Sequence, residues 1–137
     1  MPLPAILANL PLPVIGSPLF IISNPKLVIE QCKAGIVGSM PSLNARPAEQ
    51  LDEWLAEITE ALAAHDRAHP ERPAAPFAIN QIVHRSNDRL DGDMAAWSAT
   101  ACGLIVTAGE GDDGGRLHER SPRGARNARP SIVRARR

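Results

Sequence analysis

The sequence predicts an α/β fold with parallel strands, because segments that pattern as strands alternate with segments that pattern as helices. Apolar runs of strand character occupy residues 14–20, 36–40 and 77–83. Helix patterns follow at residues 25–34, 48–67 and 88–97. This alternation is typical of right-handed βαβ units around a parallel sheet. A fourth apolar run, at residues 102–109, is a candidate for a further strand.

The first strand and first helix are predicted from local signals. Residues 14–20 are apolar apart from an internal Gly-Ser, which favours a strand buried on both faces. In the helix that follows, Ser23 or Asn24 can cap the N-terminus and Pro25 fits the first helical position. Gly35 suits the position just past the C-terminus, where a left-handed backbone is common.

The helix over residues 48–67 has the clearest periodicity. Its apolar side chains recur at spacings of three and four along one face: Leu51, Trp54, Leu55, Ile58 and Leu62. Glutamates line the opposite, solvated face, and three prolines between residues 70 and 76 end the helix. The helix over residues 88–97 is more weakly patterned.

Charge divides the chain into a body, residues 1–97, and a tail, residues 98–137. The body holds 7 Lys or Arg against 11 Asp or Glu, and the tail holds 8 against 4, so the two parts carry −4 and +4. Beyond residue 109 the tail is rich in Gly, Arg and Pro and has little apolar content. Such a segment buries too little apolar surface to offset its ordering entropy, so we expect it to be disordered.

Compartment and redox state are predicted from the N-terminus and the two cysteines. No basic residue precedes the apolar start of the chain, and four prolines in the first thirteen residues would break a signal-type helix. No run approaches the roughly 20 apolar residues of a membrane span. Cys32 and Cys102 fit no metal-ligand spacing, so we expect no metal and two reduced thiols, with a single disulfide between them as the alternative. Together these features predict a cytoplasmic protein without membrane contact.

The candidate site lies where the predicted strands end, since ligands of parallel α/β folds gather at the carboxyl ends of strands. Gly16 and Gly38 would let the backbone approach a planar ligand, although a plain turn or bulge explains each of them as well. Asn80 and Gln81 are polar residues inside an apolar strand and must bond either neighbouring loops or a ligand. His84 follows them and is expected to be solvated or locally bonded.

At these residues the chain resembles the nitronate monooxygenases, formerly called 2-nitropropane dioxygenases. The resemblance covers residues 12–97 and includes the segments "PVIGSPLFIISNPKLVIEQCKAGIVGSMPSLNAR", "LDEWLAEI" and "PFAINQIVHRSNDRL". Members of that family are FMN-dependent oxidoreductases on a TIM barrel, and they oxidise alkyl nitronates with O₂ to a carbonyl compound and nitrite. The resemblance implies a partial (β/α)₈ barrel of about three βα units, with FMN as cofactor and a nitronate and O₂ as substrates.

The resemblance also assigns site residues. It implies that Ser17, Pro18 and Leu19 lie against the flavin ring, that Ser39 forms a wall of the same pocket, and that Asn80 contacts FMN with Gln81 beside it. It implies no catalytic residue in this chain, because the family's general-base histidine belongs to a later segment without a counterpart here.

Departures from the family define the alternatives. An eight-unit barrel takes about 250 residues, and the glycine-rich stretch at residues 109–115 carries three carboxylates that would repel a phosphate. The resemblance stops near residue 97, which suggests a truncated or frameshifted product with open sheet edges through which it self-associates. The alternative function is a non-catalytic fragment or small binding protein whose Arg-rich tail contacts nucleic acid or an acidic partner. The absence of aromatic residues from that tail argues against nucleic acid.

Overall fold

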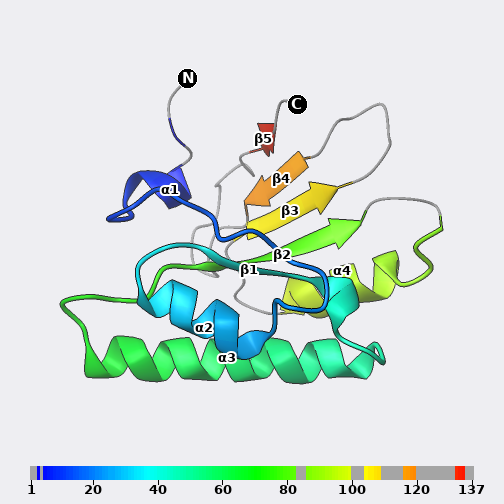
Figure 1. Ribbon diagram of the computed structural model, residues 1–137, viewed down its shortest axis with the longest axis horizontal. Coiled ribbons are helices and arrows are strands. Elements are labelled where there is room, and N and C mark those ends of the chain that lie inside the picture. The colour runs from blue at the N-terminus through cyan, green and yellow to red at the C-terminus, as the bar shows by residue number, and fades with distance from the viewer. Residues whose placement is uncertain are drawn as a thin grey trace.

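A computed structural model describes residue 3 and residues 5–82, 86–99, 104–108, 116–119 and 132–134, with side chains up to residue 96. Its elements in chain order are α1 (Ala5–Ala8), α2 (Pro25–Lys33), β1 (Gly38–Pro41), the 3₁₀ helix η1 (Ser42–Asn44), α3 (Glu49–Ala68), β2 (Phe77–Ile82), α4 (Leu90–Ala99), β3 (Leu104–Ala108), β4 (Arg116–Glu119) and β5 (Ile132–Arg134) (Figure 1).

The sheet begins with parallel strands in sequence order. β1 pairs with β2, β2 pairs with β3, and both pairs are parallel. Ahead of β1, Ile15 forms a single parallel bridge with Val37. A helix lies between β1 and β2 and another between β2 and β3. The predicted α/β class with parallel strands is therefore confirmed, and the run at residues 102–109 does contain a strand, β3.

The predicted first strand over residues 14–20 was too long. Only Ile15 makes a ladder contact, held by hydrogen bonds from Gly16 N–H to Val37 C=O (2.7 Å) and from Val37 N–H to Val14 C=O (3.0 Å). Pro18 has no N–H to donate, so the ladder cannot continue through it. The remainder of the run is a loop.

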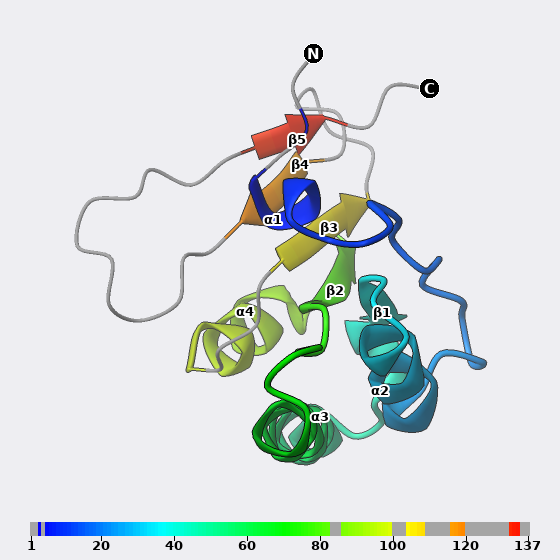
Figure 2. The ribbon, with the colours of Figure 1, turned by 90° about the vertical axis from the view of Figure 1, so that its left-hand side faces the viewer.

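The two faces of the sheet are covered by different helices (Figures 1 and 2). On the face that we call the α2/α3 face, Met40, Phe77 and Ile79 pack in one cluster with buried side chains of α2 and α3. On the opposite face, the α1 face, Val37 and Ala78 pack against Leu7 of α1. Side chains alternate between faces along each strand, so these two clusters fix the direction of every residue in β1 and β2.

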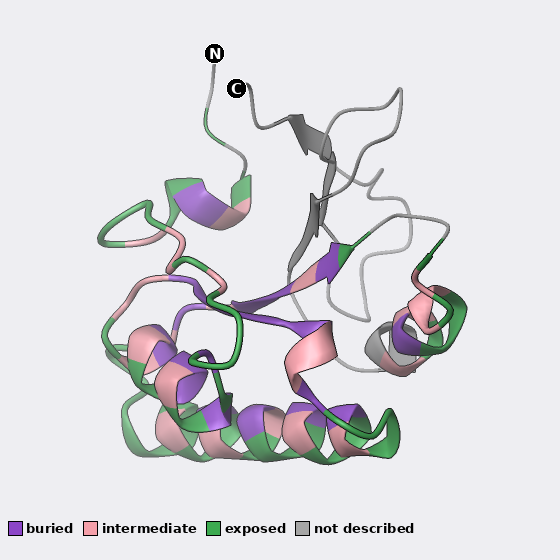
Figure 3. Ribbon diagram, turned by 45° about the vertical axis from the view of Figure 1, so that its right-hand side comes forward, coloured by how far each residue is buried: buried purple, intermediate pink, exposed green. Residues whose placement is uncertain are grey.

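Both well-marked helices are confirmed. Asn24 caps α2, with its Oδ1 accepting from Leu27 N–H at 3.1 Å, while Pro25 occupies the first turn and Gly35 has φ +93° just past the end. In α3 the buried side chains are four members of the predicted stripe: Leu51, Leu55, Ile58 and Leu62. Figure 3 shows their buried side turned toward the sheet.

Three features of the termini were not foreseen. The short helix α1 forms between the N-terminal prolines. In the tail, where we expected disorder, β4 pairs antiparallel with β3, and β5 pairs antiparallel with β4. Apolar residues at matched register positions, Leu117 opposite Val133, accompany this pairing. The third predicted strand corresponds to β2, and its outer edge, which we expected to be open, is paired with β3. No helix in the described ranges is long and apolar enough to span a bilayer.

Candidate functional site

The strand register places Ser39 and Asn80 on one face of the sheet. Ser39 is opposite Ala78, and Asn80 is two residues beyond Ala78. By alternation both are on the α1 face, near the carboxyl ends of two parallel strands. Ser17 lies in the loop that follows the bridge at Ile15, outside the strand register.

Asn80 and Gln81 point to opposite faces of β2. Asn80 shares the α1 face with Ala78, whereas Gln81 is on the α2/α3 face with Phe77 and Ile79. Within the described residues, Asn80 Oδ1 is buried and has no hydrogen-bond partner. Gln81 is 2% exposed and its Nε2 likewise has none. The two side chains therefore cannot contact one ligand from the same face of the sheet.

Ser39 joins two strand segments. It is fully buried, and its hydroxyl donates to the carbonyl oxygen of Gly16. This bond continues the pairing of the first segment with β1 beyond the bridge at Ile15. The hydroxyl proton is thereby committed to the fold, so the fully buried Ser39 side chain has no donor left for a ligand.

Gly16 and Gly38 serve packing against α2. A Cβ on Gly16 would lie 2.6 Å from Nε2 of Gln31, so this side-chain amide fills the space that we expected a planar ligand to use. A Cβ on Gly38 would meet the Val28 carbonyl and lie 3.0 Å from Cys32 Sγ. The two glycines let α2 approach the strands closely, which is the structural reason for their position.

The loop over residues 17–24 is held in one shape by Asn44 of η1. The Asn44 Nδ2 group donates to the carbonyls of Leu19 (3.0 Å) and Ser23 (2.8 Å), and its Oδ1 accepts from Ile21 N–H (3.0 Å). The buried Ser23 hydroxyl accepts from Leu19 N–H at 2.8 Å. Sequence reasoning missed Asn44, because its partners lie more than 20 residues away and no local pattern marks it.

The tip of this loop is apolar and exposed. Leu19, Phe20, Ile21 and Ile22 are 44%, 60%, 76% and 62% exposed. Ile21 has φ +67°, a left-handed conformation that a β-branched residue rarely adopts. The Arg46 guanidinium lies 5.5 Å from the centre of the Phe20 ring, within cation–π range. Of the predicted flavin contacts, Ser17 is exposed and Pro18 half-buried at the base of this tip.

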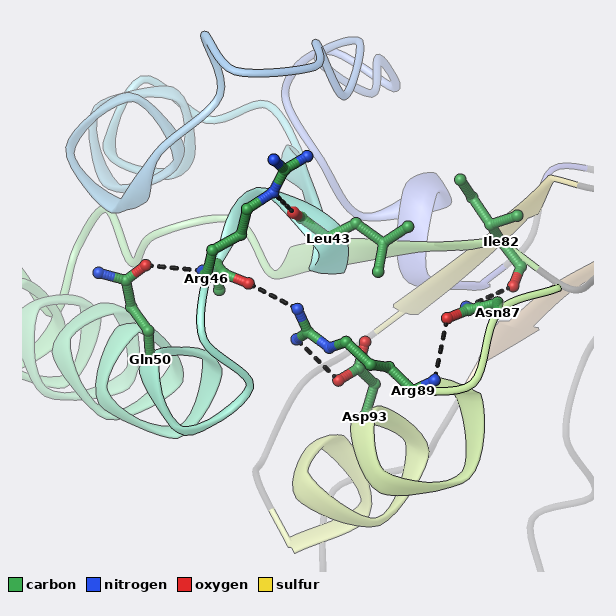
Figure 4. Close-up of polar contacts among 8 residues, drawn as sticks. Leu43, Arg46, Gln50, Ile82, Asn87, Arg89 and Asp93 are labelled. Carbon is green, nitrogen blue, oxygen red and sulfur yellow. Dashed lines mark hydrogen bonds and ion pairs between the residues drawn. The ribbon is translucent and has the colours of Figure 1, made fainter.

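A second polar network ties α4 to the segment between η1 and α3 (Figure 4). Arg89 Nη1 donates to the carbonyl of Ala45 at 2.7 Å, and its Nη2 pairs with Asp93 Oδ1 at 3.0 Å. Asp93 is 3% exposed. The backbone N–H of Arg89 also donates to Oδ1 of Asn87, at 3.2 Å. The pair fastens the helix that follows β2 to the loop that follows β1.

Cys32 is a free, buried thiol. It donates to the carbonyl of Pro76 (Sγ to O 3.5 Å), and burial raises its pKa to about 11, with a smaller opposing effect of the Gly38 backbone hydrogen bond. Cys102, the other cysteine of the chain, lies outside the described residues. A buried thiol with a raised pKa is a poor nucleophile.

Several predicted features lie outside the described part of the chain. They include His84, the glycine-rich stretch at residues 109–115 and most of the Arg-rich tail on which an acidic or nucleic-acid partner depends. Among the described residues no group of three or more His, Cys, Asp or Glu is placed to hold a metal ion.

Comparison with protein-family models, curated proteins and solved structures finds no match to this chain. What the chain does must therefore be argued from the geometry of the polar residues on the α1 face.

Proposed function

We propose that the chain is an FMN-binding member of the nitronate monooxygenase type, built as the first units of a (β/α)₈ barrel. The order of the strands supports this proposal. The segment at Ile15, β1, β2 and β3 are neighbours in sequence order, as in a barrel, whereas a doubly wound sheet reverses its order part-way. The antiparallel β4 and β5 are additions that the barrel type does not predict.

The observation that carries the proposal is the unpartnered Oδ1 of Asn80. A buried amide oxygen without a hydrogen bond costs about 1–3 kcal/mol, so a ligand that donates to it gains that free energy. The isoalloxazine ring carries an imide N–H that can donate to such an oxygen. Asn80 would thus hold the polar edge of the ring, and the backbone of residues 17–19 would flank it. Ser39 would support that backbone through its bond to Gly16.

When bound, FMN supplies the oxidation of an alkyl nitronate with O₂ to a carbonyl compound and nitrite. This chain's own residues then act as a platform that orients the ring through Asn80 and the backbone of residues 17–19. No described residue is assigned as an acid or a base.

A titration of the purified chain with FMN tests the proposal. We expect quenching of flavin fluorescence on binding, and nitrite release from an alkyl nitronate that depends on added FMN. Asn80→Leu should weaken FMN binding at least tenfold without unfolding the chain, because it removes an unsatisfied buried acceptor. Gln81→Leu, on the opposite face of the same strand, is the matched control and should bind FMN as the wild type does. The proposal would be refuted if the fluorescence of a fixed amount of FMN stayed unchanged when wild-type chain was added up to about a 100-fold excess over FMN.

A further inference from the structure

The exposed apolar surface of this protein is concentrated in one segment at the edge of the sheet. Among the described residues, eight large hydrophobic side chains are exposed, and six of them belong to residues 12–22, which we call the edge segment: Leu12, Val14, Leu19, Phe20, Ile21 and Ile22. Figure 2 shows this segment passing outside β1 and α2, and Figure 3 shows most of it exposed. Single exposed hydrophobic residues are normal on a protein surface, whereas a cluster of six in one segment indicates an interaction surface.

The backbone of the same segment presents unpaired groups. Val14 C=O and Gly16 N–H are directed at Val37, so the N–H and C=O of Ile15 point the other way, along the open edge. Neither group of Ile15 has a hydrogen-bond partner in the described residues. In a hydrogen-bonded pair of an antiparallel ladder, each residue donates its N–H to the C=O of the other. A residue with both groups directed outward, such as Ile15, can form such a pair.

Charge favours a second copy of this chain as the occupant. Residues 1–25 contain no charged side chain, the longest uncharged stretch in the sequence. At a two-fold contact the residues close to the axis lie near their own copies, so a charge there would meet a like charge. An uncharged edge avoids this repulsion, and it offers nothing to a strongly charged partner such as nucleic acid.

Pro13 and the loop after Gly16 limit how far the contact extends. The N–H that residue 13 would direct outward is missing because Pro13 is a proline, and beyond Gly16 the chain leaves the strand for the loop, so strand pairing on the open edge is confined to the residues around Ile15. A short pairing about a two-fold axis closes on itself and gives a dimer, whereas an unlimited edge would give a fibre. From these observations we propose that two copies associate through the edge segment, antiparallel about Ile15, with the apolar tips of residues 19–22 covered in the contact.

The predicted affinity is modest. An interface of standard size uses about 20–30 residues on each side, and the edge segment supplies 11, from 12 to 22 inclusive. We therefore expect a dissociation constant on the order of 10 µM. This inference holds whether or not the chain binds FMN, because none of its steps uses the cofactor.

Sedimentation velocity of the full chain, from about 1 to 200 µM, measures the association directly. We expect a monomer–dimer equilibrium, and Ile21→Asp should weaken it at least tenfold. Asp tolerates the left-handed conformation at position 21 better than Ile does, so this variant should remain folded, which circular dichroism verifies. Leu3→Asp is the matched control, since Leu3 is 55% exposed but lies outside the edge segment, and it should dimerise like the wild type.

Hydrogen exchange locates the contact independently of substitutions. The peptide that contains Ile15 should exchange more slowly as the protein concentration rises through the dissociation constant, and peptides of the exposed face of α3 should not change. Four results would overturn the proposal: a monomer at every concentration, equal association of Ile21→Asp and wild type, open-ended polymers in place of dimers, or a monomer that co-sediments with phosphatidylcholine vesicles through this segment.

Discussion

Replacing Gly38 with alanine should destabilise the protein far more than the same change at Gly16. Both glycines pack against α2, and both would place a new methyl group against a neighbour. At Gly38 the neighbours are parts of the helix itself: the carbonyl oxygen of Val28, its carbonyl carbon at 3.1 Å and the Sγ of Cys32 at 3.0 Å. At Gly16 the neighbour is the terminal amide of the Gln31 side chain, at 2.6–2.8 Å.

The two magnitudes follow from what can move. A methyl group on residue 38 must push the α2 backbone away from β1, and Gly38 and the facing Val28 and Cys32 are all buried. Overpacking of a well-packed core typically costs about 1–3 kcal/mol, and a helix backbone that must shift puts Gly38→Ala at about 3 kcal/mol. Gln31 can rotate its amide aside, and Gly→Ala recovers about 0.4–1 kcal/mol from the unfolded state, so Gly16→Ala should cost about 1 kcal/mol or less.

Urea and thermal unfolding followed by circular dichroism measure both changes. For a chain of this size about 1 kcal/mol corresponds to a shift of about 3–5 °C in Tm, so Gly38→Ala should lower Tm by about 10–15 °C and Gly16→Ala by less than about 5 °C. Equal stabilities for the two variants would contradict a close approach of the α2 backbone to Gly38.

Four further outcomes are expected. Asn44→Ala removes three hydrogen bonds from the loop over residues 17–24, so it should cost about 3 kcal/mol and speed proteolysis within that loop. Burial raises the pKa of Cys32 from 9.0 to about 11, so the stability that the protonated thiol contributes should be complete below pH 9. It should decline between pH 9 and 11, by about 2–3 kcal/mol in total. Cys32→Ala should remove this decline from the pH profile of urea unfolding. Asp93→Ala should lower the free energy of unfolding by about 3 kcal/mol, because it leaves the half-buried Arg89 unpaired. Gln81→Leu should leave stability unchanged or raise it by about 1 kcal/mol in the same assay, since it removes a buried donor without a partner.

Local signals were sufficient for α2 and α3. Asn24, Pro25 and Gly35 act on groups within four residues of themselves, and each does in the structure what its chemistry predicts. The apolar stripe of α3 needed only the helical period. Features that depend on partners distant in sequence were not predictable in this way. Nothing near Asn44 indicates that its amide would hold a loop 20 residues earlier.

The candidate site was predicted only in part, for a reason of geometry. Parallel pairing was enough to bring the ends of three strands together, so the proximity of Ser39 and Asn80 follows from the alternation of strands and helices. Which face each side chain takes depends on the strand's phase, and one position reverses it. Asn80 and Gln81 are adjacent amides that the sequence does not distinguish. Phe77 and Ile79 pack against α2 and α3, so by alternation Gln81 is on the α2/α3 face and Asn80 on the α1 face.

The edge segment shows how the same residues can lead to two different expectations. Read for pattern, residues 14–20 are a buried strand, because apolar runs are usually covered on both faces. Pro18 and the tip held by Asn44 prevent that strand, so its apolar side chains remain on the surface and one backbone residue, Ile15, keeps both groups unpaired. The apolar composition that predicted burial within one chain therefore becomes the main reason to expect burial between two chains. Association and FMN binding use different sides of this segment, the open edge and the α1 face, so Ile21→Asp and Asn80→Leu should each abolish one property and spare the other.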